Sequence, residues 1–480
     1  MRFTSIKSAA CLVVVGSLLT FHSTARADVS FLKDVAPLLL KKCTGCHGEK
    51  SNQGGYRAHT FQYLMKPAAS GLRPVVPGKP AESTLYRLVA SSISTVRMPK
   101  YDDALSAPQI ELIRKWIVEG AHYDGPDQAM LLRLAIGPRK QPPAPATYTT
   151  AVPVFAVALA PGGKSVAVAG YHEVLIYSAQ GVLLRRIGGL PQRIQSLSFS
   201  ADGATLLTAG GSPGEYGEAD VIHLSGAAKP EPLGTYLDVA LTAVYDKTEQ
   251  KIAVGSADGG VSVYSAASLK RQWVSNLHSD WVTAVSFSQD GRFVASASKD
   301  MTVKLHNAQD GTLYTTYTGH NKQLGQYRGQ DPVYSVRFSS ATDTAASAGG
   351  GKWIQLWNPE KTKEEAGSAA DMEERFMKQG HTKYLPHGFT RPVLATVLSD
   401  NRLFAASADG QVKEFDIAEM KEVQTFAGHH DWVCTVDFDR ASGLLATGSS
   451  DGEVKLWESK TGQCLHSFFA RPTGPTGPAR

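Results

Sequence analysis

The sequence contains few cysteines and no large excess of charge of either sign. Only 5 of its 480 residues are cysteine, which is too few for a disulfide scaffold of this size. Lys and Arg number 49 and Asp and Glu 44, whereas a nucleic-acid-binding protein would show a clustered basic excess. Charged residues make up only 19% and hydrophobic residues 42%, so wholesale disorder is excluded. The length fits two or more domains, or one small domain and one large repeat.

The first 27 residues have the pattern of a secretory signal. Arg2 and Lys7 precede an apolar run over residues 9–19, and Ala25-Arg26-Ala27 offers a small-x-small cleavage site before Asp28. The run is well short of the ~20 residues needed to span a bilayer, and no later stretch is apolar enough. We therefore expect an exported protein, periplasmic or otherwise extracytoplasmic, with no transmembrane segment in the mature chain.

A C-x-x-C-H motif lies shortly after the leader, at Cys43-Thr44-Gly45-Cys46-His47. This spacing lets two thiols attach to the two vinyl groups of one porphyrin, while the adjacent His is carried under the iron. A thioredoxin-like pair would need a βαβ context, and a zinc site would need another nearby pair of ligands, whereas the next cysteine is Cys434. The motif thus predicts one covalently bound haem c with Cys43, Cys46 and His47 as its attachment and ligand residues.

The second axial ligand has several candidates. Met98 follows His47 by 51 residues and lies in a polar loop over residues 94–100, from which a thioether could reach the iron. His59, Met65 and His122 are the competing donors. Ligation by His and Met fills both axial positions and raises the reduction potential, so such a domain carries single electrons and does not bind a substrate.

The flanking sequence predicts two helices with apolar faces, over residues 30–42 and from a capping box at Ser106 and Gln109 to Gly120. Four further segments accompany the C-x-x-C-H motif: Phe31-x-x-Asp34-Val35, Val76-Pro77-Gly78-x-Pro80-x-x-Ser83-x-Leu85, Arg97-Met98-Pro99 and Ile113-x-x-Trp116-Ile117-x-x-Gly120-Ala121. In these segments the sequence is similar to the planctomycete-type cytochrome c domain. The resemblance implies that Met98 is the axial ligand. Where the family usually reads Leu-Arg-Leu-Asp, this chain has residues 56–59 (Tyr-Arg-Ala-His), which leaves His59 as a competitor.

A proline-rich stretch separates this domain from the rest of the chain. Residues 125–150 contain five prolines, and residues 138–145 are typical of a semi-rigid extended spacer. Residues 130–136 are expected to form a short helix that packs on either neighbour. The tail over residues 473–480, rich in Pro, Thr and Gly, is expected to be disordered.

From about Val154 onward the sequence repeats roughly every 46 residues, close to the ~40–45-residue period of propeller units with four strands each. Each unit begins with an alternating apolar strand followed by a tight turn. Seven units are predicted. Their first strands begin near Val154, Ile194, Leu241, Trp281, Val333, Val393 and Trp432.

Short motifs recur at matching places in these repeats, namely Gly319-His320, Gly380-His381, Gly428-His429, Asp258, Asp300, Asp409, Asp451, Leu356-Trp357 and Leu456-Trp457. With these motifs the repeats resemble WD40 units across residues 151–472. In that family the GH histidine, a turn aspartate and a strand tryptophan bond within one unit, so the resemblance implies structural roles for these residues and a protein-interaction surface.

Trp281 and Trp432 are candidate contact residues on a rim, with packing between units as the alternative. Cys434 and Cys464 are expected to be buried free thiols.

The expected fold is multidomain, with a small all-α class I-like cytochrome c domain followed by an all-β seven-bladed WD40 propeller. The leading hypothesis is an electron-transfer protein whose propeller binds a redox partner protein or a larger complex, with no nucleic-acid partner. An oxidoreductase whose propeller holds a second cofactor or substrate is the alternative, and a redox or ligand sensor is a third hypothesis. The predicted boundaries are a signal peptide at 1–27, the cytochrome domain at 28–124, a linker at 125–150, the propeller at 151–472 and a tail at 473–480.

Overall fold

A computed structural model describes residues 28–49, 53–68, 71–100, 102–324, 327–339, 344–366, 380 and 382–472. They form two compact units, one up to Ile136 and the other from Gly137 onward, called here the helical unit and the β unit. The predicted leader, the predicted tail and His381 lie outside the described residues. Among the described residues, no helix is long and apolar enough to cross a membrane.

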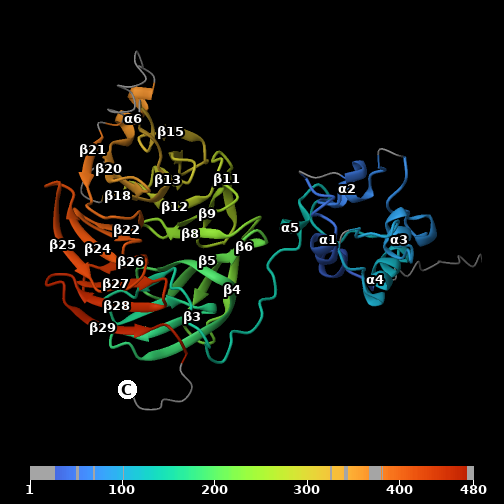
Figure 1. Cartoon of the computed structure of the whole chain (residues 1–480), viewed down its shortest axis with the longest axis horizontal. Helices are drawn as coiled ribbons and strands as arrows, with labels where there is room; N and C mark the ends of the chain where they lie inside the picture. The colour runs from blue at the N-terminus through green and yellow to red at the C-terminus, as the bar shows by residue number, and fades with distance from the viewer. Residues whose placement is uncertain are drawn as a thin grey trace, which may run out of the picture. The chain divides into compact units, whose positions relative to one another are not determined.

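The helical unit is built from short helices that pack around one small core (Figure 1). Its first helical segment begins with a π-helical turn and continues as an α-helix, with Pro37 in the first turn of the α-helical part. The elements are η1 (Phe31–Val35), α1 (Ala36–Lys42), η2 (Gln53–Gly55), α2 (Phe61–Met65), η3 (Pro80–Glu82), α3 (Thr84–Val89), α4 (Ala107–Val118) and α5 (Leu132–Ala135).

Aromatic rings from distant segments meet in the core of the helical unit. The ring of Phe31 lies 4.9 Å from that of Phe61 and 5.3 Å from that of Trp116. The predicted capping box of α4 is confirmed, because Ser106 N donates a 2.9 Å hydrogen bond to Gln109 Oε1. Leu132 of α5 is also fully buried in this core, so α5 packs on the helical unit.

The β unit consists almost wholly of antiparallel strands. One sheet has seven strands in the order β1 to β7, five sheets have four strands each (β8–β11, β12–β15, β18–β21, β22–β25 and β26–β29), and β16 and β17 form a hairpin. The strands are β1 (Val157–Leu159), β2 (Ser165–Ala169), β3 (Tyr171–Ser178), β4 (Leu183–Phe199), β5 (Thr205–Ser212), β6 (Tyr216–His223), β7 (Pro230–Tyr236), β8 (Ala240–Tyr245), β9 (Lys251–Ser256), β10 (Val261–Ser265), β11 (Arg271–Ser275), β12 (Val282–Phe287), β13 (Phe293–Ser298), β14 (Val303–Asn307), β15 (Leu313–Tyr317), β16 (Asn321–Leu324), β17 (Tyr327–Gln330), β18 (Val333–Phe338), β19 (Ala345–Gly349), β20 (Trp353–Trp357), β21 (Lys383–Pro386), β22 (Val393–Ser399), β23 (Arg402–Ser407), β24 (Gln411–Asp416), β25 (Lys421–Ala427), β26 (Val433–Asp439), β27 (Leu444–Ser449), β28 (Glu453–Glu458) and β29 (Cys464–Phe469), and helix α6 (Pro359–Ala366) follows β20.

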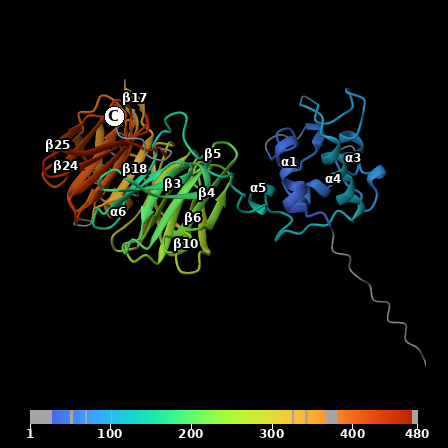
Figure 2. The same cartoon turned by 90° about the horizontal axis from the view of Figure 1, so that it is seen from below.

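The first strands of successive sheets lie side by side around a common centre (Figures 1 and 2). Strands β8, β12, β18, β22 and β26 contact one another in this order, and β1 contacts β26. Hydroxyl groups join some neighbours directly. Ser335 Oγ lies 2.6 Å from Thr396 Oγ1, and Val157 N donates a 3.3 Å hydrogen bond to Thr435 Oγ1. These bonds satisfy polar groups in the buried inner layer, where unpaired ones would be costly.

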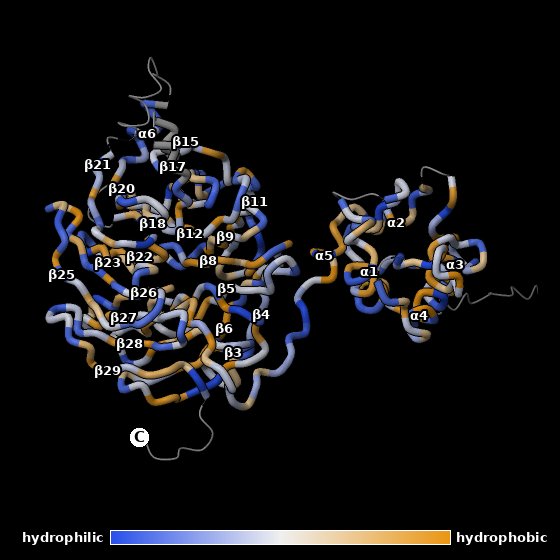
Figure 3. Tube along the Cα trace, in the orientation of Figure 1, coloured by the Kyte–Doolittle hydropathy of each residue, from blue (hydrophilic) through white to orange (hydrophobic). Residues whose placement is uncertain are grey.

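The predicted spacer divides between the two units. The segment that follows α5 is hydrophilic (Figure 3), and its side chains bind the β unit. Gln141 Nε2 donates a 3.1 Å hydrogen bond to Glu218, and the guanidinium of Arg139 lies 4.3 Å from the ring centroid of Tyr216. The stretch from Arg139 onward is therefore held by side-chain contacts to the β unit and is not a free tether.

The two cysteines of the last sheet are free thiols, as predicted. The expectation that both are buried is wrong, because Cys464 lies on the edge strand β29 and is exposed, while Cys434 is half-buried. An edge strand leaves one side without a neighbouring strand, and this exposes side chains that an inner strand would cover.

Candidate functional site

The helical unit contains an open cavity of about 620 Å³ between α1, the segment after Cys43 and α3. Its size is typical of a site for a cofactor. The residues that line it are Leu39, Lys41, Lys42, Cys43, Gly45, Cys46, His47, Gln53, Gly54, Tyr56, Ala58, Ala68, Leu72, Pro74, Thr84, Leu85, Leu88, Val89, Met98, Pro99, Lys100 and Asp102.

All four predicted site residues line this one cavity, and three of them come from the turn that ends α1. Cys43 is the C-cap of α1, and its N–H donates a 2.8 Å hydrogen bond to Leu39 O. His47 N donates a 2.9 Å hydrogen bond to Cys43 O. The turn thus presents Cys43, Cys46 and His47 to the same space.

The imidazole of His47 is oriented by a backbone carbonyl. Its Nδ1 lies 3.4 Å from Tyr56 O, so the Nδ1–H tautomer donates there and leaves the Nε2 lone pair free to bind a metal. Tyr56 also packs its ring 5.3 Å from the imidazole and lines the cavity. The sequence contains no signal for this carbonyl contact.

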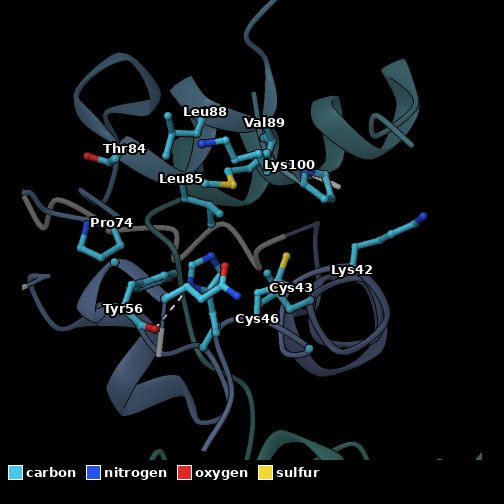
Figure 4. A pocket seen from close by; sticks show the side chains of 18 of the residues that line it. Lys42, Cys43, Cys46, Tyr56, Pro74, Thr84, Leu85, Leu88, Val89 and Lys100 are labelled. Atoms are coloured by element: carbon cyan, nitrogen blue, oxygen red, sulfur yellow. Dashed lines mark hydrogen bonds between the residues drawn. The ribbon is translucent and has the colours of Figure 1, made fainter. Parts of the chain in front are cut away.

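Met98 belongs to the wall across the cavity. In Figure 4, Leu85, Leu88 and Val89 lie on the side of the cavity facing Cys43 and Cys46. Met98 N donates a 3.1 Å hydrogen bond to Leu88 O, which attaches the methionine segment to this wall. A thioether on one wall and an imidazole on the other are the two donors that a six-coordinate haem iron requires.

The competing donors have other surroundings and do not line the cavity. The ring of His59 stacks on that of Tyr63 at 4.9 Å. Met65 packs against the core of the helical unit. His122 contributes its carbonyl oxygen to a 3.0 Å hydrogen bond from Trp116 Nε1.

The residues present fit a haem. The cavity joins apolar walls to two thiols, one imidazole and one thioether, which is the donor set for covalent attachment and six-coordinate iron. Burial, with a smaller contribution from Cys46, raises the pKa of the Cys43 thiol to about 11, so this thiol is neutral at pH 7. Leu85, Leu88 and Val89 in the apolar wall follow the i, i+3, i+4 spacing of one helix face. This spacing can be seen in the sequence.

Histidines of the β unit form buried networks, two of which include tryptophan. His320 Nε2 lies 2.8 Å from Ser347 Oγ, which also accepts a 3.0 Å hydrogen bond from Trp357 Nε1. In the last sheet, Thr447 Oγ1 lies 2.7 Å from His429 Nε2 and accepts a 2.9 Å hydrogen bond from Trp457.

A third network has a different composition. His278 Nδ1 lies 2.7 Å from Asp300 Oδ2, and His278 Nε2 lies 2.8 Å from Ser296 Oγ. His306 occupies the place of the tryptophan, with Nε2 3.3 Å from Ser296 Oγ. Although Ser, His and Asp meet here, Ser296 is fully buried, so its hydroxyl cannot reach a substrate. The predicted turn residues Asp258, Asp409 and Asp451 instead accept backbone hydrogen bonds near their own turns.

Trp281 and Trp432 precede the inner strands β12 and β26 and are 40% and 50% exposed. The ammonium of Lys299 lies 3.4 Å from the ring centroid of Trp281. Both rings are therefore largely outside the packed core, which supports the prediction that they are available on a rim.

Comparison with known proteins matches both parts of the chain. The family model described as Planctomycete cytochrome C matches residues 43–102, and the model described as WD domain, G-beta repeat matches residues 270–307, 311–358 and 420–458. These matches agree with the two resemblances seen in the sequence.

Curated relatives cover the repeat region in part. The chain is 25% identical over 238 residues to a guanine nucleotide-binding protein subunit beta of Zea mays, which covers 47% of this chain and 58% of that protein. It is 27% identical over 241 residues to periodic tryptophan protein 2 of Arabidopsis thaliana, covering 50% of this chain and 24% of that protein. The chain thus spans less than two thirds of each of these relatives.

Proposed function

We propose that this chain, which joins a cytochrome c-type segment to WD repeats, is an exported electron-transfer protein with a protein-interaction propeller. The observation that carries the proposal is the convergence of Cys43, Cys46, His47 and Met98 on one apolar cavity. Cys43 and Cys46 would hold one haem through two thioether bonds, and His47 and Met98 would be its axial ligands. The bound group supplies an iron that gains or loses one electron.

The residues of the cavity define how such a group is used. Tyr56 O holds the His47 ring so that Nε2 points toward the cavity. The apolar side chains of α3 exclude water from the side of Met98. His47 and Met98 would both be donors to the iron, and the chemistry that such a group would supply here is the transfer of single electrons.

We infer that the β unit is a seven-bladed propeller. Strand β4 is 17 residues long, and its first part pairs with β3 while its last part pairs with β5. The seven-stranded sheet is thus two four-stranded blades that share β4, and five further four-stranded sheets complete the ring. Contacts between β1 and β26 close it, which protects the inner edges.

The propeller serves as the docking platform for a redox partner or a complex. The exposed Trp281 and Trp432 support this role, since aromatic side chains are enriched among the anchors of protein interfaces. The leader pattern supports export to the periplasm, and the mature protein should then begin at Asp28. Mass spectrometry of the protein recovered from the periplasm tests this directly.

The experiment that tests the electron-carrier role is absorption spectroscopy with a haem-to-protein ratio, after export in a host that matures c-type haem. We expect one low-spin haem per chain that persists after denaturation, and a Met–iron charge-transfer band. Met98→Ala should abolish the band, whereas Met65→Leu should retain it. A second chromophore, or more than one haem per chain, would overturn the proposal in favour of an oxidoreductase.

A further inference from the structure

We propose that the ion pair of Lys42 and Asp102, two residues that line the cavity, is a latch that positions Met98 as a ligand of the proposed haem. This inference rests on the proposed haem site and adds two residues to it. In this proposal, the charged pair holds together the two walls of the cavity that carry His47 and Met98.

The two residues flank the proposed attachment and ligand positions. Lys42 is the last residue of α1 and directly precedes Cys43, and Asp102 follows Met98 by four positions in the chain. Lys42 Nζ lies 2.7 Å from Asp102 Oδ2, and both side chains line the cavity. The Lys42 side chain is 18% exposed and the Asp102 side chain 49%, so the lysine end of the pair is shielded from solvent and the carboxylate end is not.

The latch attaches the described residues that follow Met98 to another element. Before Met98, the segment is fixed by the hydrogen bond from Met98 N to Leu88 O. Among the described residues after it, the next one that is buried is Leu105. In the described part of residues 99–104, the Lys42–Asp102 pair is the single hydrogen bond or ion pair to another element. This pair therefore fixes the second side of the Met98 segment.

The position of Lys42 makes this contact specific to the site. Because α1 also ends in the turn that carries Cys43 and His47, the ion pair joins that turn directly to the segment of Met98. Lys41 lines the same cavity but takes part in no ion pair among the described residues. The hydrogen bond from Lys42 also lowers the pKa of the Asp102 carboxyl, which keeps the carboxylate charged at neutral pH.

The test uses the full-length haem-loaded protein and follows the Met–iron charge-transfer band in increasing denaturant. Variants Lys42→Gln and Asp102→Asn remove one partner each, and the double variant Lys42→Asp/Asp102→Lys restores the pair in reverse. Controls Lys33→Gln and Asp103→Asn remove the same charges at exposed positions of the helical unit that do not line the cavity. Far-UV circular dichroism of each sample reports whether the helical unit is still folded.

We expect each single latch variant to increase the equilibrium constant for loss of the band by about two- to five-fold, as the strength of partly exposed ion pairs implies. The loss should occur before the helices unfold, and the swapped pair should recover much of the difference. Both controls should match the unmodified protein. High salt should reduce the difference between the latch variants and the unmodified protein, because it screens the pair.

Equal effects of the latch variants and the control variants on loss of the band would overturn the latch. The latch would also be overturned if, in denaturant, the band disappeared only when the circular dichroism signal of the helices disappeared. A protein that binds haem but never shows the band would overturn both the latch and the role of Met98. If the unmodified protein showed the band and the latch variants lost it at the same denaturant concentration, the latch alone would be overturned and the proposed function would stand.

Discussion

The hydroxyl of Tyr148 donates a 2.8 Å hydrogen bond to Glu173 Oε1, which ties the predicted spacer to strand β3 of the β unit. Glu173 has a side chain that is only 1% exposed and is also bound by Arg186, whose Nε lies 2.7 Å from Glu173 Oε2. Arg186 in turn donates a 2.8 Å hydrogen bond to Ala146 O. A buried carboxylate thus organises the end of the spacer.

Replacing Arg186 by Gln should destabilise the β unit by about 3 kcal/mol, because it leaves a buried carboxylate without its cation. The free energy of unfolding in denaturant, followed by tryptophan fluorescence, measures this. Arg193→Gln is the control, since Arg193 is exposed and should change stability by less than about 0.5 kcal/mol. Equal stabilities of the two variants would show that Glu173 does not depend on Arg186.

Replacing Thr447 by Val should cost about 2–4 kcal/mol of β-unit stability. The change preserves shape but removes the oxygen shared by His429 and Trp457, and leaving buried polar groups unpaired costs about 1–3 kcal/mol each. The comparison is Thr425→Val on the outer strand β25, where the side chain is exposed. Similar unfolding midpoints for both variants would contradict the role of this network.

Acid should weaken the β unit through His306 between about pH 6.5 and pH 4. Burial lowers the pKa of His306 from 6.5 to about 4, so in this window the unfolded chain binds a proton that the folded chain excludes. Stability therefore falls as pH falls, by up to about 3 kcal/mol in total.

The variant His306→Gln should show a shallower dependence of unfolding free energy on pH within this window. His466→Gln, at an exposed position, should follow the unmodified protein. An unchanged slope in His306→Gln would mean that the acid sensitivity comes from other groups, such as His429, whose pKa burial also lowers to about 4.

Replacing Asp220 by Asn should stabilise the β unit at pH 8. Burial and the neighbouring Glu218 raise the pKa of Asp220 well above its usual value, so the folded chain must keep a proton there that the unfolded chain releases. The folding stability that depends on this bound proton falls as pH rises. The asparagine amide is always neutral and avoids this fall, which is about 1–3 kcal/mol. Asp310→Asn is the control: hydrogen bonds from Thr312 lower the pKa of Asp310, so its contribution is constant above its usual pKa and the variant should change stability equally at pH 5 and pH 8. Thermal unfolding at pH 5 and pH 8 distinguishes the two.

The double variant Cys43→Ser/Cys46→Ser should weaken the helical unit and leave the β unit unaffected. The cavity of about 620 Å³ would lose the covalently attached haem that we propose, whereas the two units have separate cores. Calorimetry of the unmodified protein should show two transitions, of which only one shifts in the variant. A shift of both transitions would show that the units unfold together.

Several features followed from local sequence patterns. The capping box at Ser106 and Gln109 and the buried stripe from Phe31 to Leu39 depend on residues within one or two helical turns, so spacing alone predicts them. Strands β8, β12, β18, β22 and β26 similarly begin at or next to the predicted residues, because alternating apolar residues require a face to bury. Strand β1 instead begins at Val157, three residues after the predicted Val154, and the predicted Ile194 lies within the long strand β4. The network around Ser296 was not predicted, because it depends on the pairing of β13 with β14, which brings His306 to Ser296.

The C-x-x-C-H motif at Cys43 depends on the spacing of neighbouring residues, and it was enough to indicate the type of cofactor. The repeat period of the later sequence was enough to indicate a repetitive β architecture. They did not distinguish Met98 from His59, Met65 and His122, since each could donate to iron. The family resemblance favours Met98, and in the folded chain Met98 lines the cavity whereas the other three donors do not. The hydrogen bond from Met98 N to Leu88 O at the end of α3 brings Met98 to this cavity, although it lies 51 residues after His47 in sequence. The Lys42–Asp102 pair and the attachment of Tyr148 have the same origin: contacts between distant segments depend on the burial and packing of the whole unit.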